Sequence, residues 1–190
     1  MKPFVFLLVT ATLAYGLELK YDDGEYEGWA GSYQISGVWF DAEDFVSSCD
    51  SFDLDRIDIW FGDAPWATDS ARIVIRAVDP EIGFPLPGVP IVNEWIIANP
   101  SGVTSLTFSP AITIPANFAV LEYGRSQAEP APKIALDTTE AEGHTIYQQW
   151  GWGPIYWSFY TGGNFAIRCY GEPAEQALET STWASIKRCI

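Results

Sequence analysis

Four carboxylates stand close together near the start of the chain, in the stretch YDDGEYEGWAG at residues 21–31. Carboxylate oxygens are the ligands that calcium prefers, so Asp22, Asp23 and Glu25 are candidate metal ligands. The EF-hand spacing is not met, because Asp22 and Asp23 are adjacent and Gly24 follows at once. An Asp-Gly pair also favours a turn with positive φ, for which no metal is needed. The stretch therefore predicts either a turn or part of a calcium site completed by distant acids, and we expect no other cofactor.

A second group of residues that could bind a ligand is the aromatic stretch WGWGPIYWSFY at residues 150–160. Flat aromatic rings stack on the apolar faces of sugars while the sugar hydroxyls stay hydrated. The expected stacking residues are Trp150, Trp152, Tyr156, Trp157 and, from an earlier strand, Trp60. The alternative is that these rings pack in the core and at the edge of a strand pair. Trp39 and Trp95 fall within expected strands and are interpreted as packing residues.

Nucleophilic catalysis is not favoured. His144 is the only histidine, and no G-x-S-x-G elbow supplies a serine for a triad. The position of His144 in EGHT, at the entry to an expected strand, indicates a turn or surface residue. Two acids across a cleft can hydrolyse glycosides, but a chain with 25 acidic residues contains such pairs by chance. We therefore expect no enzymatic activity and keep a secreted hydrolase with an Asp/Glu pair as an alternative.

The first sixteen residues, MKPFVFLLVTATLAYG, have the layout of a secretory signal peptide, with cleavage expected after Gly16. The apolar run is shorter than the roughly 20 residues that a bilayer span needs, so no membrane span is expected. The segment predicts a secreted protein that is extracellular or at the cell surface.

The charge of the chain excludes one class of partners. Its 25 acidic and 10 basic residues give a net charge of −15, which repels nucleic acids and anionic membranes. A hydrophobic content of 48% argues against disorder. The length of the chain suits one domain with a substantial core.

The three cysteines, Cys49, Cys169 and Cys189, lack the spacing and the histidine partners of a zinc site. In an oxidising compartment two of them can form a disulfide, which leaves the third free or bridged to another chain. The sequence leaves both the Cys49–Cys169 and the Cys169–Cys189 pairing open.

Short strands separated by turn residues must position these groups. The segments DRIDIWFG and ARIVIRAVD alternate between two faces, as strands do. Further strands are expected at residues 17–21, 32–40, 92–98, 103–109, 117–123, 133–137, 144–150 and 164–170. Gly and Pro clusters, among them SPAITIPAN at residues 109–117, are expected to be turns. This pattern predicts an all-β, jelly-roll-like antiparallel β-sandwich over residues 17–171.

The last stretch of the chain, residues 172–190, changes character. Its first half is small, polar and acidic, which is typical of a linker. In STWASIKRCI, Trp183, Ile186 and Ile190 lie on one side of an expected short C-terminal helix. Either Trp183 packs on the sandwich, or the tail is a sorting or anchoring signal.

The chain also resembles a little-characterised class of extracellular bacterial β-sandwich domains. The resemblance rests on a first strand followed by YDDG and on the late segment HTIYQQWGWGPIYWSFYTGGNFAIRCYG, and it covers residues 17–171. Such domains occur in secreted multidomain proteins, beside peptidases or ahead of C-terminal sorting and immunoglobulin-like modules. The resemblance implies a secreted accessory or surface domain and supplies no catalytic residues.

The function expected from the sequence is that of a secreted, non-catalytic binding or cell-surface module, with a glycan or a cell-surface protein as partner. One alternative is a structural subunit of an envelope or filament, held through sheet edges and the spare cysteine. The other is the hydrolase described above.

Overall fold

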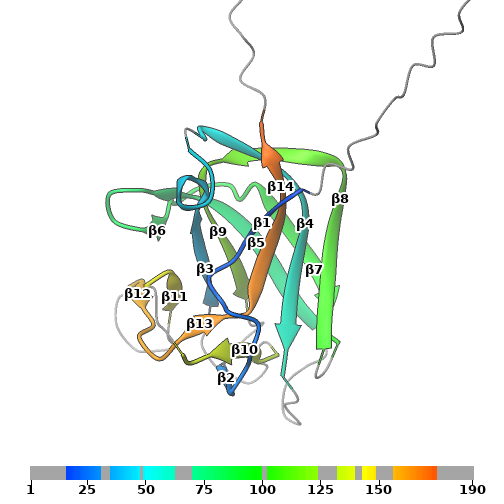
Figure 1. The fold of residues 1–190 in the computed structure, drawn as a ribbon, viewed down its shortest axis with the longest axis vertical. Coiled ribbons are helices and arrows are strands. Elements are labelled where there is room, and N and C mark those ends of the chain that lie inside the picture. The colour runs from blue at the N-terminus through cyan, green and yellow to red at the C-terminus, as the bar shows by residue number, and fades with distance from the viewer. Residues whose placement is uncertain are drawn as a thin grey trace, which may run out of the picture.

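The computed structural model describes residues 16–30, 35–47, 49–62, 70–99, 102–123, 132–139, 143–148 and 156–174. These residues form two antiparallel β-sheets, which confirms the predicted all-β sandwich (Figure 1). The only helical element among them is a short 3-10 helix, η1 (Ala42–Asp44). The expected C-terminal helix lies outside the described residues.

Sheet A and sheet B each contain seven strands within the described ranges. Sheet A follows the order β1 (Leu17–Leu19), β14 (Ile167–Pro173), β4 (Ser51–Phe61), β10 (Ile134–Asp137) and β13 (Asn164–Phe165). In addition, β2 (Gly28–Ala30) pairs with β10, and β8 (Gly102–Pro115) pairs with β4. Sheet B follows the order β12 (Ser158–Phe159), β11 (Thr145–Gln148), β3 (Ile35–Asp41), β9 (Asn117–Tyr123), β5 (Ser70–Asp79) and β6 (Phe84–Pro85). In addition, β7 (Val92–Ile97) pairs with β5. The short strands β2 and β10 to β13 gather at one end of the molecule (Figure 1).

The main core lies between the two sheets. In β4, Ile57, Ile59 and Phe61 are buried in it, as the alternation of the sequence predicts. From sheet B, the buried side chains of Ile73 and Phe118 complete the opposite side. The inner faces of both sheets thus remove their apolar side chains from water, which is the main stabilising contribution to such a sandwich.

A second, smaller cluster covers part of the outer face of sheet B. Val74, Leu121 and Ile146 are buried there, and Phe84 and Trp157 pack against the cluster. Sheet B is therefore covered on both faces along part of its length. This explains why β5 and β9 are apolar on both faces, and it anchors the segments around β6 and β12 to the sheet.

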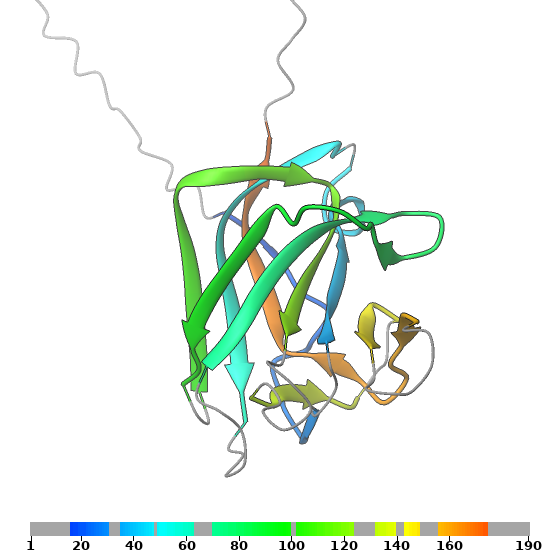
Figure 2. The ribbon, with the colours of Figure 1, turned by 180° about the vertical axis from the view of Figure 1, so that it is seen from behind.

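The prediction of a turn at residues 109–117 is wrong for most of that range. Strand β8 continues through Pro110 to Pro115, and Thr113 lies opposite Asp53 of β4. Proline is tolerated because β8 pairs with β4 alone among the described strands, so a missing N–H can face away from the ladder. Seen from behind, β8 rises along one side and then arches over the top of the molecule (Figure 2).

The cysteines do not form the first of the two disulfides considered above. Cys49 and Cys169 are both buried and free. Cys49 Sγ donates a hydrogen bond to the carbonyl of Ser51 at 3.1 Å. Burial raises the pKa of Cys169 well above its ordinary value, which keeps the thiol protonated and unreactive. The Cys169–Cys189 alternative involves a residue outside the described ranges.

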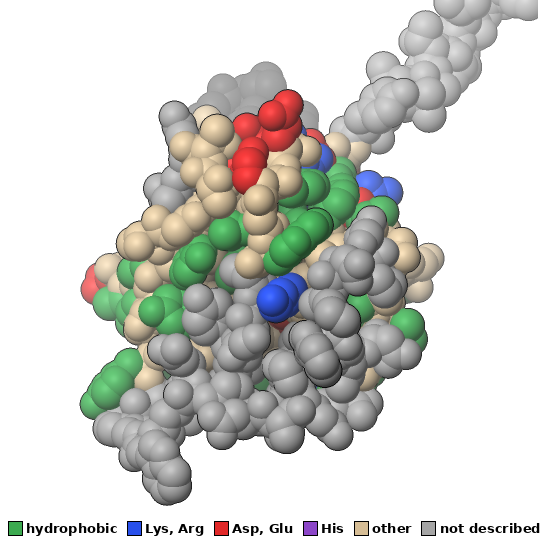
Figure 3. Space-filling model, turned by 90° about the horizontal axis from the view of Figure 1, so that it is seen from below, with side chains coloured by type: hydrophobic (Ala, Val, Ile, Leu, Met, Phe, Trp, Pro, Cys, Tyr) green, Lys and Arg blue, Asp and Glu red, His purple; other side chains and the backbone are tan. Residues whose placement is uncertain are grey.

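No helix in the described part of the chain has the length and apolar character needed to cross a membrane. The end of the molecule viewed from below shows hydrophobic side chains in several separate groups, with basic and acidic side chains between and around them (Figure 3).

Candidate functional site

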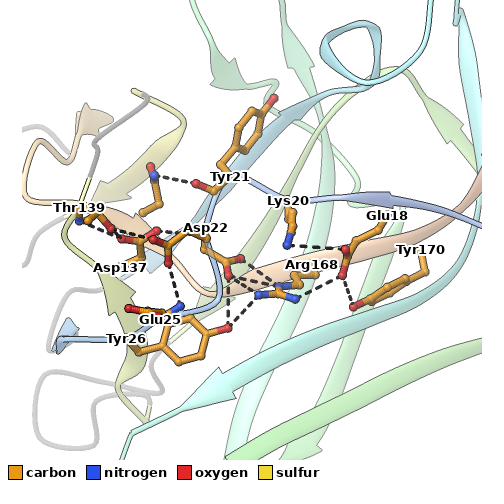
Figure 4. A network of polar contacts seen from close by, with 12 residues as sticks. Glu18, Lys20, Tyr21, Asp22, Glu25, Tyr26, Asp137, Thr139, Arg168 and Tyr170 are labelled. Carbon is orange, nitrogen blue, oxygen red and sulfur yellow. Dashed lines mark hydrogen bonds and ion pairs between the residues drawn. The ribbon is translucent and has the colours of Figure 1, made fainter.

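The acidic stretch at the start of the domain is held by a buried ion pair. Arg168 of β14 donates from Nη2 to Asp22 Oδ1 at 2.5 Å, and its Nε lies 3.2 Å from both Asp22 oxygens (Figure 4). Arg168 Nη1 also lies 3.3 Å from Glu18 Oε1, which accepts a hydrogen bond from the Tyr170 hydroxyl at 2.7 Å. Burial alone would lower the pKa of Arg168, but the hydrogen bond and the charge of Asp22 raise it. Asp22 is thus engaged in a structural contact.

The predicted turn at Asp23-Gly24 is confirmed. Gly24 has a φ of 96°, and Asp23 Oδ1 accepts a hydrogen bond from the Glu25 amide at 2.8 Å. The Asp23 amide donates to Asp137 Oδ2 at 2.9 Å, which ties the turn to β10. Burial would raise the pKa of Asp137, but hydrogen bonds from Thr139 and Asp23 lower it. The turn is therefore fixed by contacts within the protein.

The three candidate calcium ligands do not converge. Asp22 is buried against Arg168, whereas Asp23 and Glu25 are exposed. A pocket of about 340 Å³ beside the turn is lined by Asp22, Asp23 and Asp137 together with polar neighbours. Among the described residues, no group of three or more His, Cys, Asp or Glu side chains is placed to hold a metal ion. Calcium binding stays a prediction that this geometry does not support.

Trp60, a predicted stacking residue, belongs to the same network on sheet A. The guanidinium carbon of Arg168 lies 4.7 Å from the centre of the Trp60 ring, and the Tyr26 ring lies 6.0 Å away. Trp60 is half-buried by these neighbours. It therefore lies on a different sheet from β12, the strand of sheet B that directly follows Trp157.

His144 also has a packing role. Its ring stacks on Tyr21 with centroids 3.8 Å apart, and its Nδ1 lies 3.0 Å from the carbonyl oxygen of Trp39. Its Nε2 lies 3.7 Å from a carboxylate oxygen of Asp44. The ring is half-buried, so the expectation of a surface residue is only partly right. No serine or cysteine nucleophile is among these contacts.

A row of side chains crosses sheet B from β7 to β11. Arg72 lies directly opposite Trp95 in β7 and directly opposite Tyr123 in β9. Tyr123 is opposite Ile35 of β3, and Ile35 is opposite Gln148 of β11. Directly opposite residues of antiparallel strands place their side chains on the same face. Because neighbouring strands are about 4.8 Å apart, the row extends over roughly 19 Å.

The row lies on the outer face of the sheet. Ile73, the neighbour of Arg72 in β5, is buried in the main core on the inner face. Trp95, which the sequence analysis interprets as a packing residue, is 52% exposed. The guanidinium carbon of Arg72 lies 5.5 Å from the centre of the Tyr123 ring, and its Nε donates to Asn93 Oδ1 at 2.6 Å. The row thus presents aromatic rings, a guanidinium and amides together.

A groove continues from this row. Tyr123 and Gln148 line it together with Trp157, Arg76 and residues 85–88, and its volume is about 490 Å³. Arg76 Nη1 donates to two carbonyls of the segment 85–88, at 2.6 and 3.4 Å. These bonds hold the proline-containing segment against the sheet and so give the groove a fixed wall. We call the row and this groove together the sheet B face.

The sheet B face contains part of the predicted aromatic site. Trp157 lines the groove, and Tyr156, next to it in sequence, is 71% exposed. Trp150 and Trp152 lie outside the described residues. Sequence reasoning missed Arg72, Tyr123 and the exposure of Trp95. The alternation in β7 places Trp95 with Asn93 and Ile97 on one face, but apolar residues on both faces of this strand hide the signal.

A buried carboxyl lies on the opposite face of the same strands. Glu122 is 1% exposed, and its Oε1 has no hydrogen-bond partner among the residues that the structure describes. Burial raises the pKa of Glu122 well above its ordinary value, although a hydrogen bond from Ser36 acts in the opposite direction. Its directly opposite neighbours, Ser36 and Ile73, supply no second carboxyl. The next carboxyl on this face of the described strands is that of Glu94, which lies opposite Ile73 in β7 and is exposed.

Comparisons of the chain with protein-family models, with curated proteins and with solved structures give no match. The resemblance to extracellular bacterial β-sandwich domains therefore stays a prediction.

Proposed function

We propose that the protein is a secreted, non-catalytic binding module that holds a glycan on the sheet B face. The observation that carries this proposal is the row formed by Trp95, Arg72 and Tyr123, which meets the Trp157 groove at Tyr123. Aromatic rings on a flat sheet can stack on the apolar faces of successive sugars, and a guanidinium and amides can bond their hydroxyls.

The arrangement of the sheet supports a binding role because the row needs little ordering when a ligand arrives. Its side chains stand on five paired strands, and Arg72 is held by Asn93 and by the Tyr123 ring. A site that is ordered before binding loses less conformational entropy on association. The leader-like residues 1–16 support a location outside the cell, where such a ligand is met.

The experiment is a glycan array followed by calorimetry on Trp95→Ala and Tyr123→Ala. We expect each variant to lose about five- to thirtyfold in affinity for the glycans that the unaltered protein binds, because each removes a stacking surface worth about 1 to 2 kcal/mol. Trp29→Ala is the matched control. Trp29 is 49% exposed, close to the 52% of Trp95, but it belongs to β2 of sheet A.

Two results would contradict the proposal. One is the absence of any glycan bound by the unaltered protein on the array. The other is an equal loss of affinity in Trp95→Ala and Trp29→Ala, which would place the ligand elsewhere or reveal a general loss of folding. Melting curves of all the variants distinguish a ligand that is bound elsewhere from a general loss of folding.

A further inference from the structure

Two arginines of the sheet B face have no acidic partner among the described residues. The chain has 25 acidic and 10 basic residues, so an arginine without a carboxylate neighbour is unexpected. Arg56 and Arg168, the other arginines in the described ranges, both form ion pairs, at 3.2 Å with Asp58 and at 2.5 Å with Asp22. Within the described ranges, Arg72 and Arg76 instead contact neutral groups: an amide oxygen, a tyrosine ring and two backbone carbonyls.

The two guanidinium groups stand on one face of one strand. Residues four apart in a strand share a face, so Arg72 and Arg76 both point to the outer side of β5, with Val74 between them. In the part of the chain that the structure describes, neither the row nor the lining of the groove contains a carboxylate. The hydrogen bonds described for Arg72 use Nε, and those for Arg76 use Nη1. Each guanidinium carries five N–H donors, so both retain donors for a ligand.

We propose that the ligand of the sheet B face is an anionic glycan, whose carboxylate or sulfate groups pair with Arg72 and Arg76. This inference rests on the proposed function and names the class of sugar. The planar fork of a guanidinium matches the two oxygens of an oxyanion, and such charged hydrogen bonds are roughly twice as strong as neutral ones. Trp95, Tyr123 and Trp157 supply the stacking surface beside these charges.

The net charge of the protein does not prevent this binding. A charge of −15 repels an anion at long range, but at physiological salt the interaction is screened beyond about 8 Å. An oxyanion in contact with a guanidinium is about 4 Å from its charge, which lies within the screening length. The attraction between an oxyanion and the arginines of the sheet B face therefore outweighs the screened repulsion by the distant acidic residues.

The test compares three probes by calorimetry: polygalacturonate for carboxylates, dextran sulfate for sulfates, and hydroxyethyl cellulose as an uncharged glycan. We expect the unaltered protein to bind at least one anionic probe ten times or more tightly than the uncharged one. Arg72→Gln and Arg76→Gln are each expected to lower the anionic affinity at least fivefold and to lower the uncharged affinity by a smaller factor. Which of the two anionic probes binds identifies the oxyanion.

Arg56→Gln is the matched control, since it removes the same charge from sheet A. A loss of anionic affinity equal to that of Arg72→Gln would overturn the inference, because it would mean binding by overall charge. Arg72→Lys and Arg76→Lys keep the positive charge but remove the planar guanidinium. They are used in place of any glutamine variant that fails to fold. If only the uncharged probe binds, the inference fails and the proposed function stands; if no probe or array glycan binds, both fail.

Discussion

Asp22 and Arg168 are 146 residues apart in the sequence and form one buried ion pair, with Nη2 and Oδ1 separated by 2.5 Å. The Asp22 side chain is fully buried, and that of Arg168 is 13% exposed. The pair joins the segment after β1 to the last strand of the domain. It therefore fastens the segment after β1 to the start of β14, at the end of the β1–β14 pair that is remote from the described termini.

Arg168→Met is expected to destabilise the protein strongly. It leaves the buried Asp22 carboxylate without its cationic partner and with only the Tyr26 hydroxyl, 3.2 Å away, so we expect the free energy of unfolding to fall by about 3 kcal/mol. Urea unfolding measured by tryptophan fluorescence gives this difference. Lys20→Met is the control, because the Lys20–Glu18 pair is 3.8 Å long and partly exposed and should contribute less than about 1 kcal/mol. Equal effects of the two substitutions would contradict a special role for the buried pair.

Removal of calcium is expected to leave stability unchanged. Asp22 is occupied by Arg168, and the amide of Glu25 rather than a metal occupies Asp23 Oδ1. Melting temperatures with millimolar calcium and with a chelator should therefore agree within error. A clear rise with calcium would show that a site exists after all and would restore Asp22, Asp23 and Glu25 as its candidate ligands.

Glu122→Gln is expected to stabilise the protein at neutral pH. The folded-state pKa of Glu122 is raised above 4.5, so the folded protein keeps a proton that the unfolded chain releases. The stability that this group contributes is fully present below about pH 4.5 and is lost as the pH rises toward the folded-state pKa. Glutamine cannot ionise, so the difference in melting temperature between variant and unaltered protein should grow between pH 5 and pH 8. A difference that stays constant over this range would show that Glu122 is not protonated in the fold.

Reducing agents are expected to have no effect on the described core. Cys49 and Cys169 are free and buried, so a Cys189→Ser variant should expose no reactive thiol when folded and two when unfolded. Titration with a chromogenic thiol reagent, with and without denaturant, measures this. Two thiols missing from the denatured sample would instead indicate a disulfide between Cys49 and Cys169.

The regular strands were predictable because their alternation is local. The pattern in NFAVLEY gives β9 with its observed bounds, Asn117–Tyr123. The second half of β8 was not predictable, because its prolines resemble turn residues unless the strand is known to pair on one side only.

The sites depended more on pairing across the sheet than on local pattern. YDDG correctly indicated a turn at Gly24, but nothing near Asp22 in the sequence identifies Arg168 as its partner. Trp95 is interpreted from the sequence as a packing residue because it falls within an expected strand, and only the register with Arg72 places it on the outer face. Long-range register is set by the whole fold, so these relationships could not be derived from the separate segments.

The pairing of β1 with β14 decides how the domain responds to a pulling force. The two strands are antiparallel and Leu17 lies opposite Gly171, so the start of β1 and the end of β14 lie at the same end of the pair. Tension applied at these two points acts along the hydrogen bonds of the ladder, which run perpendicular to the strands, and breaks them one after another. With only three residues in β1, this peeling begins at low force. A domain stretched between the start of β1 and the end of β14 therefore loses β1 from the sheet first.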